Sequence, residues 1–193
     1  MTNDRFHVHK LYYDAIDDLR ISLRWMARDI ENDEIARCRR DGVPYVPFRY
    51  ANGDTRKQLL ARAKYILTKH ASRWTKSQQW RADIIFEFYP ELKKAYDLAL
   101  ELTDIFNRRV DKDVARLNLA RWYNKVDEMD GGQFRTVTET FRNHYDTILN
   151  YFINRSTNAG AESFNAKVKA FRSQFRGVAD IPFFLFRVSK LCA

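Results

Sequence analysis

The sequence has little of what cross-links or interrupts a chain: its 193 residues include two cysteines, six glycines and four prolines. Cys38 and Cys192 are too few for a disulfide framework and do not have the spacing of a zinc site, so we expect a reducing, cytoplasmic setting. Scarce glycine and proline argue against a turn-rich β fold and favour long helices.

Long apolar runs are also missing. A membrane-spanning helix needs roughly 18 or more consecutive apolar residues, and the densest apolar patch, Ile181–Phe186, is far shorter. Met1–Lys10 has no apolar segment of the kind found in secretory signals. The motifs G-x-x-x-x-G-K-[ST], G-x-G-x-x-G and G-x-S-x-G do not occur, which excludes the usual nucleotide-binding and serine-hydrolase classes. No membrane association is expected.

Positive charge is what the sequence has in excess. Lys and Arg number 34 against 25 Asp and Glu, which gives a net charge of +9 and a pI of about 9.6. Such a balance favours an anionic partner, most commonly nucleic acid, although a basic but otherwise ordinary soluble protein fits equally well. The length suits one domain with a real core or a large piece of a bigger protein.

Apolar residues recur at helical spacing along most of the chain, which predicts a mainly α protein. The exception is Arg5–His9, where polar and apolar residues alternate; this predicts a short N-terminal strand with Asp4 at or before its start. The segment Gly42–Asp54, with two prolines and an Asn-Gly pair, is the clearest loop. Helices are predicted over residues 10–40, 55–70, 75–88, 91–109, 112–129, 134–154, 157–176 and 183–191.

The helix predicted over Thr157–Arg176 has two opposed stripes. The apolar stripe is Phe164, Val168, Phe171 and Phe175, and the polar stripe is Asn158, Glu162, Asn165, Lys169, Arg172 and Arg176. One interpretation is an ordinary solvated face, which is common on exposed helices. The other is a metal-binding carboxylate followed by cations that hold a polyanion. Spacing alone does not choose between them.

Two further features have both a functional and a structural interpretation. Trp122 could stack on a nucleic-acid base, but its spacing favours a core position. His7 and His9 would face the same side of a strand, as two metal ligands might, yet no third ligand stands nearby. Surface or cleft-edge histidines are therefore the better interpretation of that pair.

Two distant stretches resemble one family. Asn3–Val8 (NDRFHV) is similar to the "DRFH" segment of bacterial insertion-sequence transposases of the ISL3 type. Thr157–Lys169 resembles that family's C-terminal helix, N-x-x-x-E-x-x-N-x-x-x-K. Between them, Tyr89–Leu92 leading a helix and a segment with Trp122 follow in the family's order, so the resemblance covers almost the whole chain.

The resemblance implies a ribonuclease-H-like catalytic core with two Asp and one Glu, in which a helical insertion separates the second Asp from the Glu. Asp4 matches that second Asp and Glu162 matches the Glu. Residues 1–19 would then belong to the core, 20–153 to the insertion, and 154–193 to the last core helices. At most one short N-terminal strand would accompany these helices.

The implied activity is DNA cutting and strand transfer. Asp4 and Glu162 would hold Mg²⁺ or Mn²⁺ for in-line displacement at phosphorus. Lys169, Arg172 and Arg176 would hold phosphates of the transposon ends and the target DNA. Asn165, one turn from Glu162, would orient that carboxylate or touch the DNA backbone, and Trp122 is the further DNA-contact candidate.

One departure from the family pattern is that no residue matches the first catalytic Asp, because its second Asp already stands at position 4. We expect the C-terminal part of a split or truncated transposase, with little activity alone. A separate N-terminal polypeptide would then supply the first Asp, and the active form would be a homo-oligomer. The alternatives are a non-catalytic basic helical module that binds DNA or protein, and an unrelated basic helical protein.

Overall fold

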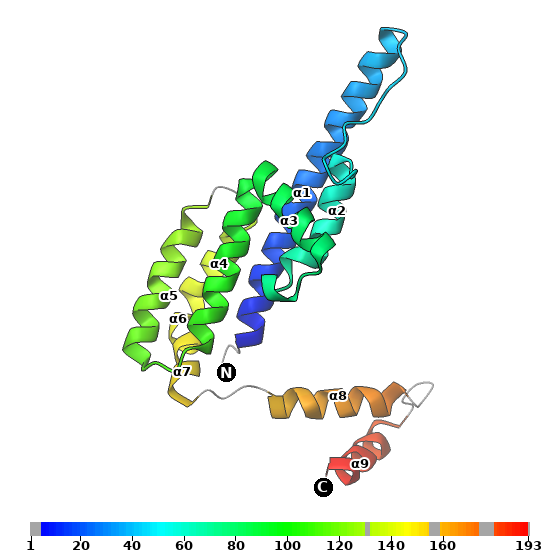
Figure 1. The fold of residues 1–193 in the computed structure, drawn as a ribbon. Helices are drawn as coiled ribbons and strands as arrows, with labels where there is room; N and C mark the ends of the chain where they lie inside the picture. Colours follow the sequence, from blue (N-terminus) through cyan, green and yellow to red (C-terminus); the bar gives the residue numbers. More distant parts are fainter. Residues whose placement is uncertain (1–4, 130–131, 155–158, 174–179, 193) are drawn as a thin grey trace.

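The structure is a computed structural model that describes residues 5–129, 132–154, 159–173 and 180–192 (Figure 1). Within these ranges every regular element is helical, which confirms the predicted mainly α class, and the ribonuclease-H-like core stays an expectation. The elements are α1 (Arg5–Arg40), α2 (Arg56–Leu67), the 3₁₀ helix η1 (Ala71–Arg73), α3 (Lys76–Phe88), α4 (Pro90–Asn107), α5 (Lys112–Asp127), α6 (Arg135–Leu149), α7 (Tyr151–Asn154), α8 (Ala159–Ser173) and α9 (Ile181–Cys192).

The predicted N-terminal strand is wrong, because Arg5–His9 form the first turns of α1. Val8 is 2% exposed and opens a buried stripe that continues at helical spacing through Tyr12, Ile16 and Leu19. An alternation over five residues carries little weight against a stripe that is buried along half of a 36-residue helix.

Local capping signals set most other helix boundaries. Thr55 with Gln58 and Thr75 with Gln78 form capping boxes at the starts of α2 and α3. Pro90 is the first residue of α4, where its missing N–H costs nothing. Gly42, with a φ of +67°, follows the end of α1. The helix predicted over residues 134–154 is divided instead, because Asn150 separates α6 from α7.

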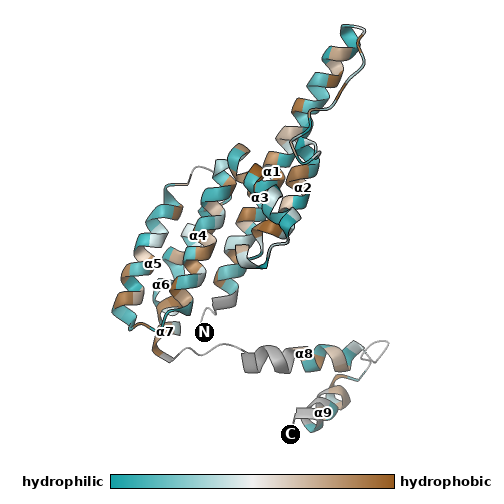
Figure 2. Ribbon diagram, in the orientation of Figure 1, coloured by the Kyte–Doolittle hydropathy of each residue, from teal (hydrophilic) through white to brown (hydrophobic). Residues whose placement is uncertain are grey.

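The core lies where α1, α4, α5 and α6 meet. The ring of Tyr12 lies 5.3 Å from that of Trp122 and 5.5 Å from that of Phe134, and its hydroxyl donates to the Ala95 carbonyl at 3.1 Å. Helices α2 and α3 pack beside α1 and α4 and bury Leu59, Leu60 and Ile85. The helices carry hydrophobic and hydrophilic residues side by side, as amphipathic helices do (Figure 2). In the described part of the chain, no helix is long and apolar enough to cross a membrane.

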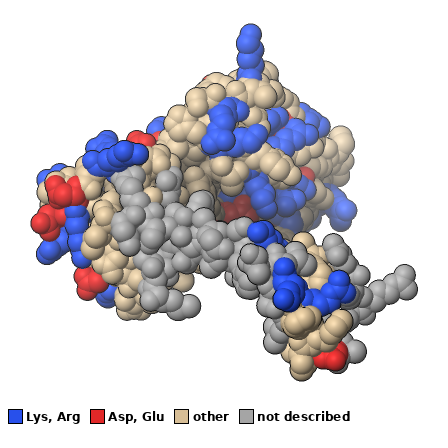
Figure 3. Space-filling view, turned by 90° about the horizontal axis from the view of Figure 1, so that it is seen from below, with Lys and Arg blue, Asp and Glu red and all other residues tan. Residues whose placement is uncertain are grey.

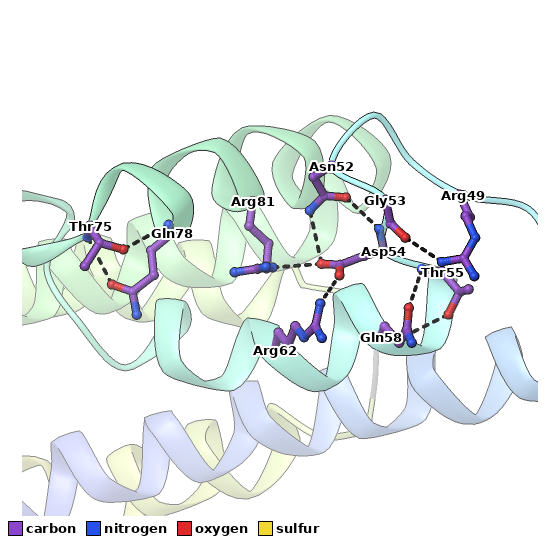
Figure 4. A network of polar contacts seen from close by, with 10 residues as sticks. All are labelled: Arg49, Asn52, Gly53, Asp54, Thr55, Gln58, Arg62, Thr75, Gln78 and Arg81. Atoms are coloured by element: carbon purple, nitrogen blue, oxygen red, sulfur yellow. Dashed lines mark hydrogen bonds and ion pairs between the residues drawn. The ribbon is translucent and has the colours of Figure 1, made fainter.

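The C-terminal half of α1 extends beyond the bundle, and residues 41–55 run back along it (Figure 1). Asp54 fixes the end of this loop: its buried carboxylate accepts hydrogen bonds from Arg62 of α2, from Arg81 of α3 (2.9 Å) and from the Asn52 amide (3.1 Å) (Figure 4). Gly53, with a φ of +80°, makes the turn before it.

Helices α8 and α9 lie below the bundle in the view of Figure 1. They pack on each other, and the rings of Phe171 and Phe184 stack with centroids 5.7 Å apart. The first turn of α1, helix α7 and helix α8 are all at this end of the molecule (Figure 1). The fold therefore brings the described parts of the two segments that carry the family resemblance, far apart in sequence, to the same end.

Candidate catalytic and nucleic-acid-binding region

Helix α8 has the two faces that the sequence predicts, as far as its side chains are described. Phe171 is buried and Val168 is half-buried on one face. Lys169 and Arg172, three residues apart and so neighbours on the helix surface, are exposed on the other. Two cations therefore face solvent from adjacent turns.

The other predicted site residues are described only in part or not at all. Glu162 and Asn165 belong to the backbone of α8, but their side chains lie outside the described residues. Asp4 and Arg176 also lie outside them, although Asp4 directly precedes the first residue of α1. At a helical rise of 1.5 Å per residue, Lys169 stands about 10 Å along α8 from Glu162, measured between backbones.

The electrostatic setting of α8 is positive. Seen from below, Lys and Arg are visible on the part of the molecule that holds α8 and α9 and over the right-hand side of the bundle (Figure 3). Acidic side chains are seen mainly on the opposite side, where α4 and α5 lie. The exposed Lys169 and Arg172 give α8 a positive surface, which suits a polyanion.

The described residues contain no group of three or more His, Cys, Asp or Glu placed to bind a metal ion, and the two carboxylates that the resemblance implies as ligands, those of Asp4 and Glu162, lie outside them. The first turn of α1 has no acidic residue of its own. Carboxylate oxygens are the donors that Mg²⁺ and Mn²⁺ prefer, so the residue types at positions 4 and 162 fit the ion in chemical kind.

Trp122 does not belong to a DNA-contacting surface. Its side chain is fully buried, its ring centroid lies 4.8 Å from that of Phe141, and its Nε1–H donates to the Leu98 carbonyl at 2.8 Å. An indole with no exposed surface cannot stack on a base. The DNA-contact prediction for Trp122 is therefore wrong, and its core spacing is the correct interpretation.

The pair of His7 and His9 also changes meaning, because both lie on a helix. Residues two apart on a helix point about 200° apart around its axis, so their rings do not face one side. His7 is exposed, and the ring of His9 is edge-on to Phe106 at 5.4 Å. The pair is not a metal-binding arrangement, in agreement with the interpretation favoured from the sequence.

A basic groove that the sequence interpretation does not include lies on α1, where that helix leaves the bundle beside α2. Its volume is about 560 Å³ and it is lined by Arg20, Ile21, Arg24, Trp25, Arg28 and Lys57. A usable signal was present, because Arg20, Arg24 and Arg28 recur every four residues and so share one face. The neighbouring Lys57 comes from α2 and could be placed only by the tertiary structure.

Comparison with known proteins identifies the family to which the chain belongs. No curated protein and no solved structure matches this chain significantly. A family model described as transposase matches residues 1–188 and so includes both segments that carry the resemblance. Because this match covers nearly the whole sequence, the chain belongs to the ISL3-type family of DDE transposases.

Proposed function

We propose that this chain acts in DNA transposition by contributing two acidic residues of the catalytic set, Asp4 and Glu162, together with the basic helix α8. The observation that carries the proposal is the family match over residues 1–188, which spans both motifs. The reaction is the cutting of DNA and the transfer of its strands by displacement at phosphorus.

The fold supports a shared site for the two motifs. The first turn of α1, next to Asp4, and helix α8, which contains Glu162, lie at the same end of the molecule (Figure 1). A carboxylate next to a helix N-terminus is favoured by the helix dipole, and Asp4 directly precedes α1. Helices α1 to α7 thus return the chain to the end where it started.

The chemistry divides between the carboxylates and the cations. Divalent ions held by Asp4 and Glu162 would stabilise the charge on the attacking and leaving oxygens. Lys169 and Arg172, exposed on adjacent turns of α8, hold DNA phosphates and so position the strand. Asn165, at i+3 from Glu162, lies one turn along the helix and orients that carboxylate.

Calorimetric titration of Mn²⁺ into the purified chain, with and without a short DNA duplex, tests the proposal. We expect saturable binding in the wild type and its loss in Asp4→Ala and in Glu162→Ala. Glu139→Ala is the matched control, because Glu139 is an exposed helical carboxylate on α6 whose contact with Arg135 is at the surface. The control should bind Mn²⁺ as the wild type does.

Two outcomes would contradict the proposal in different ways. Binding of Mn²⁺ that survives both substitutions would place the ion elsewhere and remove the assignment of Asp4 and Glu162. No binding by the wild type, with DNA binding that weakens as salt rises, would favour the non-catalytic basic helical module. The circular dichroism spectrum of each variant shows whether its helices are retained.

A further inference from the structure

The groove on α1 has a floor that is fixed by buried polar contacts. Arg20 is 5% exposed, its Nε lies 2.7 Å from Asp17 Oδ1, and its Nη1 donates to the Leu60 carbonyl of α2 at 3.2 Å. This guanidinium is thus anchored to both helices. The rest of the groove is built on a fixed base rather than on mobile side chains.

Ion pairs between α1 and α2 mark the two ends of the groove. Lys64 Nζ lies 3.8 Å from Asp17 Oδ2 at one end, and Lys57 Nζ lies 2.5 Å from Glu31 Oε2 at the other. Between them stand Arg24 and Arg28, both exposed. Arg28 pairs with its neighbour Asp29, whereas Arg24 has no ion pair among the described residues.

Cations outnumber carboxylates here. Five cationic side chains (Arg20, Arg24, Arg28, Lys57 and Lys64) meet three carboxylates (Asp17, Asp29 and Glu31). All three carboxylates are paired: Asp17 with Arg20 and Lys64, Glu31 with Lys57, and Asp29 with Arg28. The groove therefore carries a net positive charge, and Arg24 presents an exposed cation at its rim that has no ion pair among the described residues.

Trp25 is the second unusual feature of the groove. Its side chain is 52% exposed, although a tryptophan side chain is normally buried for the most part in a monomeric protein. The Arg28 guanidinium lies 4.0 Å from the centroid of its ring. Grooves that bind nucleic acid combine a solvent-exposed aromatic ring with neighbouring arginines. The cations contact successive phosphates, and the ring packs on a sugar or base.

We propose that this groove binds the phosphodiester backbone of DNA, through Arg24 and Arg28 with Trp25 packed beside them. Arginines four residues apart on a helix are separated by an axial rise of about 6 Å, a spacing at which each can contact a successive phosphate of one strand. The inference rests on the proposed function, since it names a second surface by which the same transposase holds its DNA.

The test is fluorescence anisotropy of a labelled 30-base-pair duplex of random sequence, measured against the chain at several salt concentrations. An Arg24→Gln, Arg28→Gln double variant should bind about 25-fold more weakly at 0.15 M salt, because each lost phosphate contact costs about fivefold there. The slope of log affinity against log salt should fall in magnitude by about two. Trp25→Ala should weaken binding with the salt slope unchanged.

Lys93→Gln, Lys94→Gln is the matched control. It removes the same two positive charges, but from α4. As with Arg28 in the groove, one of the two cations is paired, Lys93 with Asp97, and both side chains are exposed. The neighbouring Ala95 contacts Tyr12, so this control site stands about 18 Å along α1 from Arg24. The control should lose only the small amount of affinity that follows from its lower net charge.

The outcomes separate this inference from the proposed function. If the double variant of α1 keeps the affinity and slope of the wild type while Lys169→Gln, Arg172→Gln weakens binding, the groove is not a DNA site and the proposed function stands. If the wild type shows no salt-dependent binding of DNA, both fail. Arg24→Gln alone, at an exposed position with no ion pair in the described part of the chain, gives the same test should the double variant not fold.

Discussion

At the residue scale, the two tryptophans Trp122 and Trp25 show that an aromatic side chain takes its role from its surroundings. Trp122 is covered on all sides and its N–H is bonded to the Leu98 carbonyl. Trp25 is half in water beside Arg28. Burial makes the first a stability residue and exposure leaves the second available to a ligand.

Truncating each tryptophan should therefore change different properties. Trp122→Ala should lower the free energy of unfolding by about 3–5 kcal/mol, because it leaves a large cavity in the core. Trp25→Ala should change it by less than about 0.5 kcal/mol, as exposed positions usually do. Urea denaturation followed by circular dichroism measures both. Equal losses of unfolding free energy in the two variants would mean that Trp122 does not stabilise the core.

At the scale of elements, Asp54 decides how the loop after α1 joins the bundle. Its carboxylate side chain is 3% exposed and meets Arg62 of α2 and Arg81 of α3 (Figure 4). The loop has two prolines and few buried residues. The Asp54 carboxylate connects it to α2 and to α3. Removing it leaves two guanidinium groups without their partner.

We expect Asp54→Ala to destabilise the protein by about 1–3 kcal/mol, because hydrogen bonds to a buried carboxylate are lost while Arg62, whose side chain is 54% exposed, keeps its contact with water. The loop at residues 42–54 should also become more sensitive to limited proteolysis, because its C-terminal anchor is lost. Asp29→Ala, at an exposed pair with Arg28, is the control and should change stability little. Unaltered proteolysis of the loop would show that other contacts hold it.

At the scale of the whole molecule, buried tyrosines join helices that are distant in sequence. Burial raises the pKa of Tyr96 to about 12, and it also raises the pKa of Tyr12 and of Tyr89. The hydroxyl of Tyr96 donates to the Lys69 carbonyl at 2.8 Å, and that of Tyr12 to the Ala95 carbonyl. Each group is neutral in the folded protein at neutral pH.

The stability of the bundle should therefore fall in alkali. An unfolded tyrosine loses its proton near pH 10, below the pKa of the folded one, so the unfolded state binds fewer protons as the pH rises from 10 to 12. Each such tyrosine lowers the free energy of unfolding by at most about 1.4 kcal/mol per pH unit in that range. Tyr96→Phe should remove one such contribution from the slope. A flat profile from pH 10 to 12, measured by urea denaturation, would contradict this account.

The sequence by itself determined the helical class and most helix boundaries. Capping boxes at Thr55 and Thr75 and the proline at position 90 act within one or two turns, so their effect does not depend on distant parts of the chain. The opposed faces of α8 could also be predicted from the sequence, because helical periodicity alone places Lys169 and Arg172 on one face and Phe171 on the other. Family membership followed from two local motifs in order.

The tertiary structure decided what depends on contacts between distant residues. It extended α1 to Arg5 because Val8 is buried against the bundle, and it placed Trp122 in the core. It also set Lys57 of α2 beside Arg24 of α1 and enclosed Asp54 between two arginines. Periodicity states which residues share a face of one helix, whereas only packing states what that face meets.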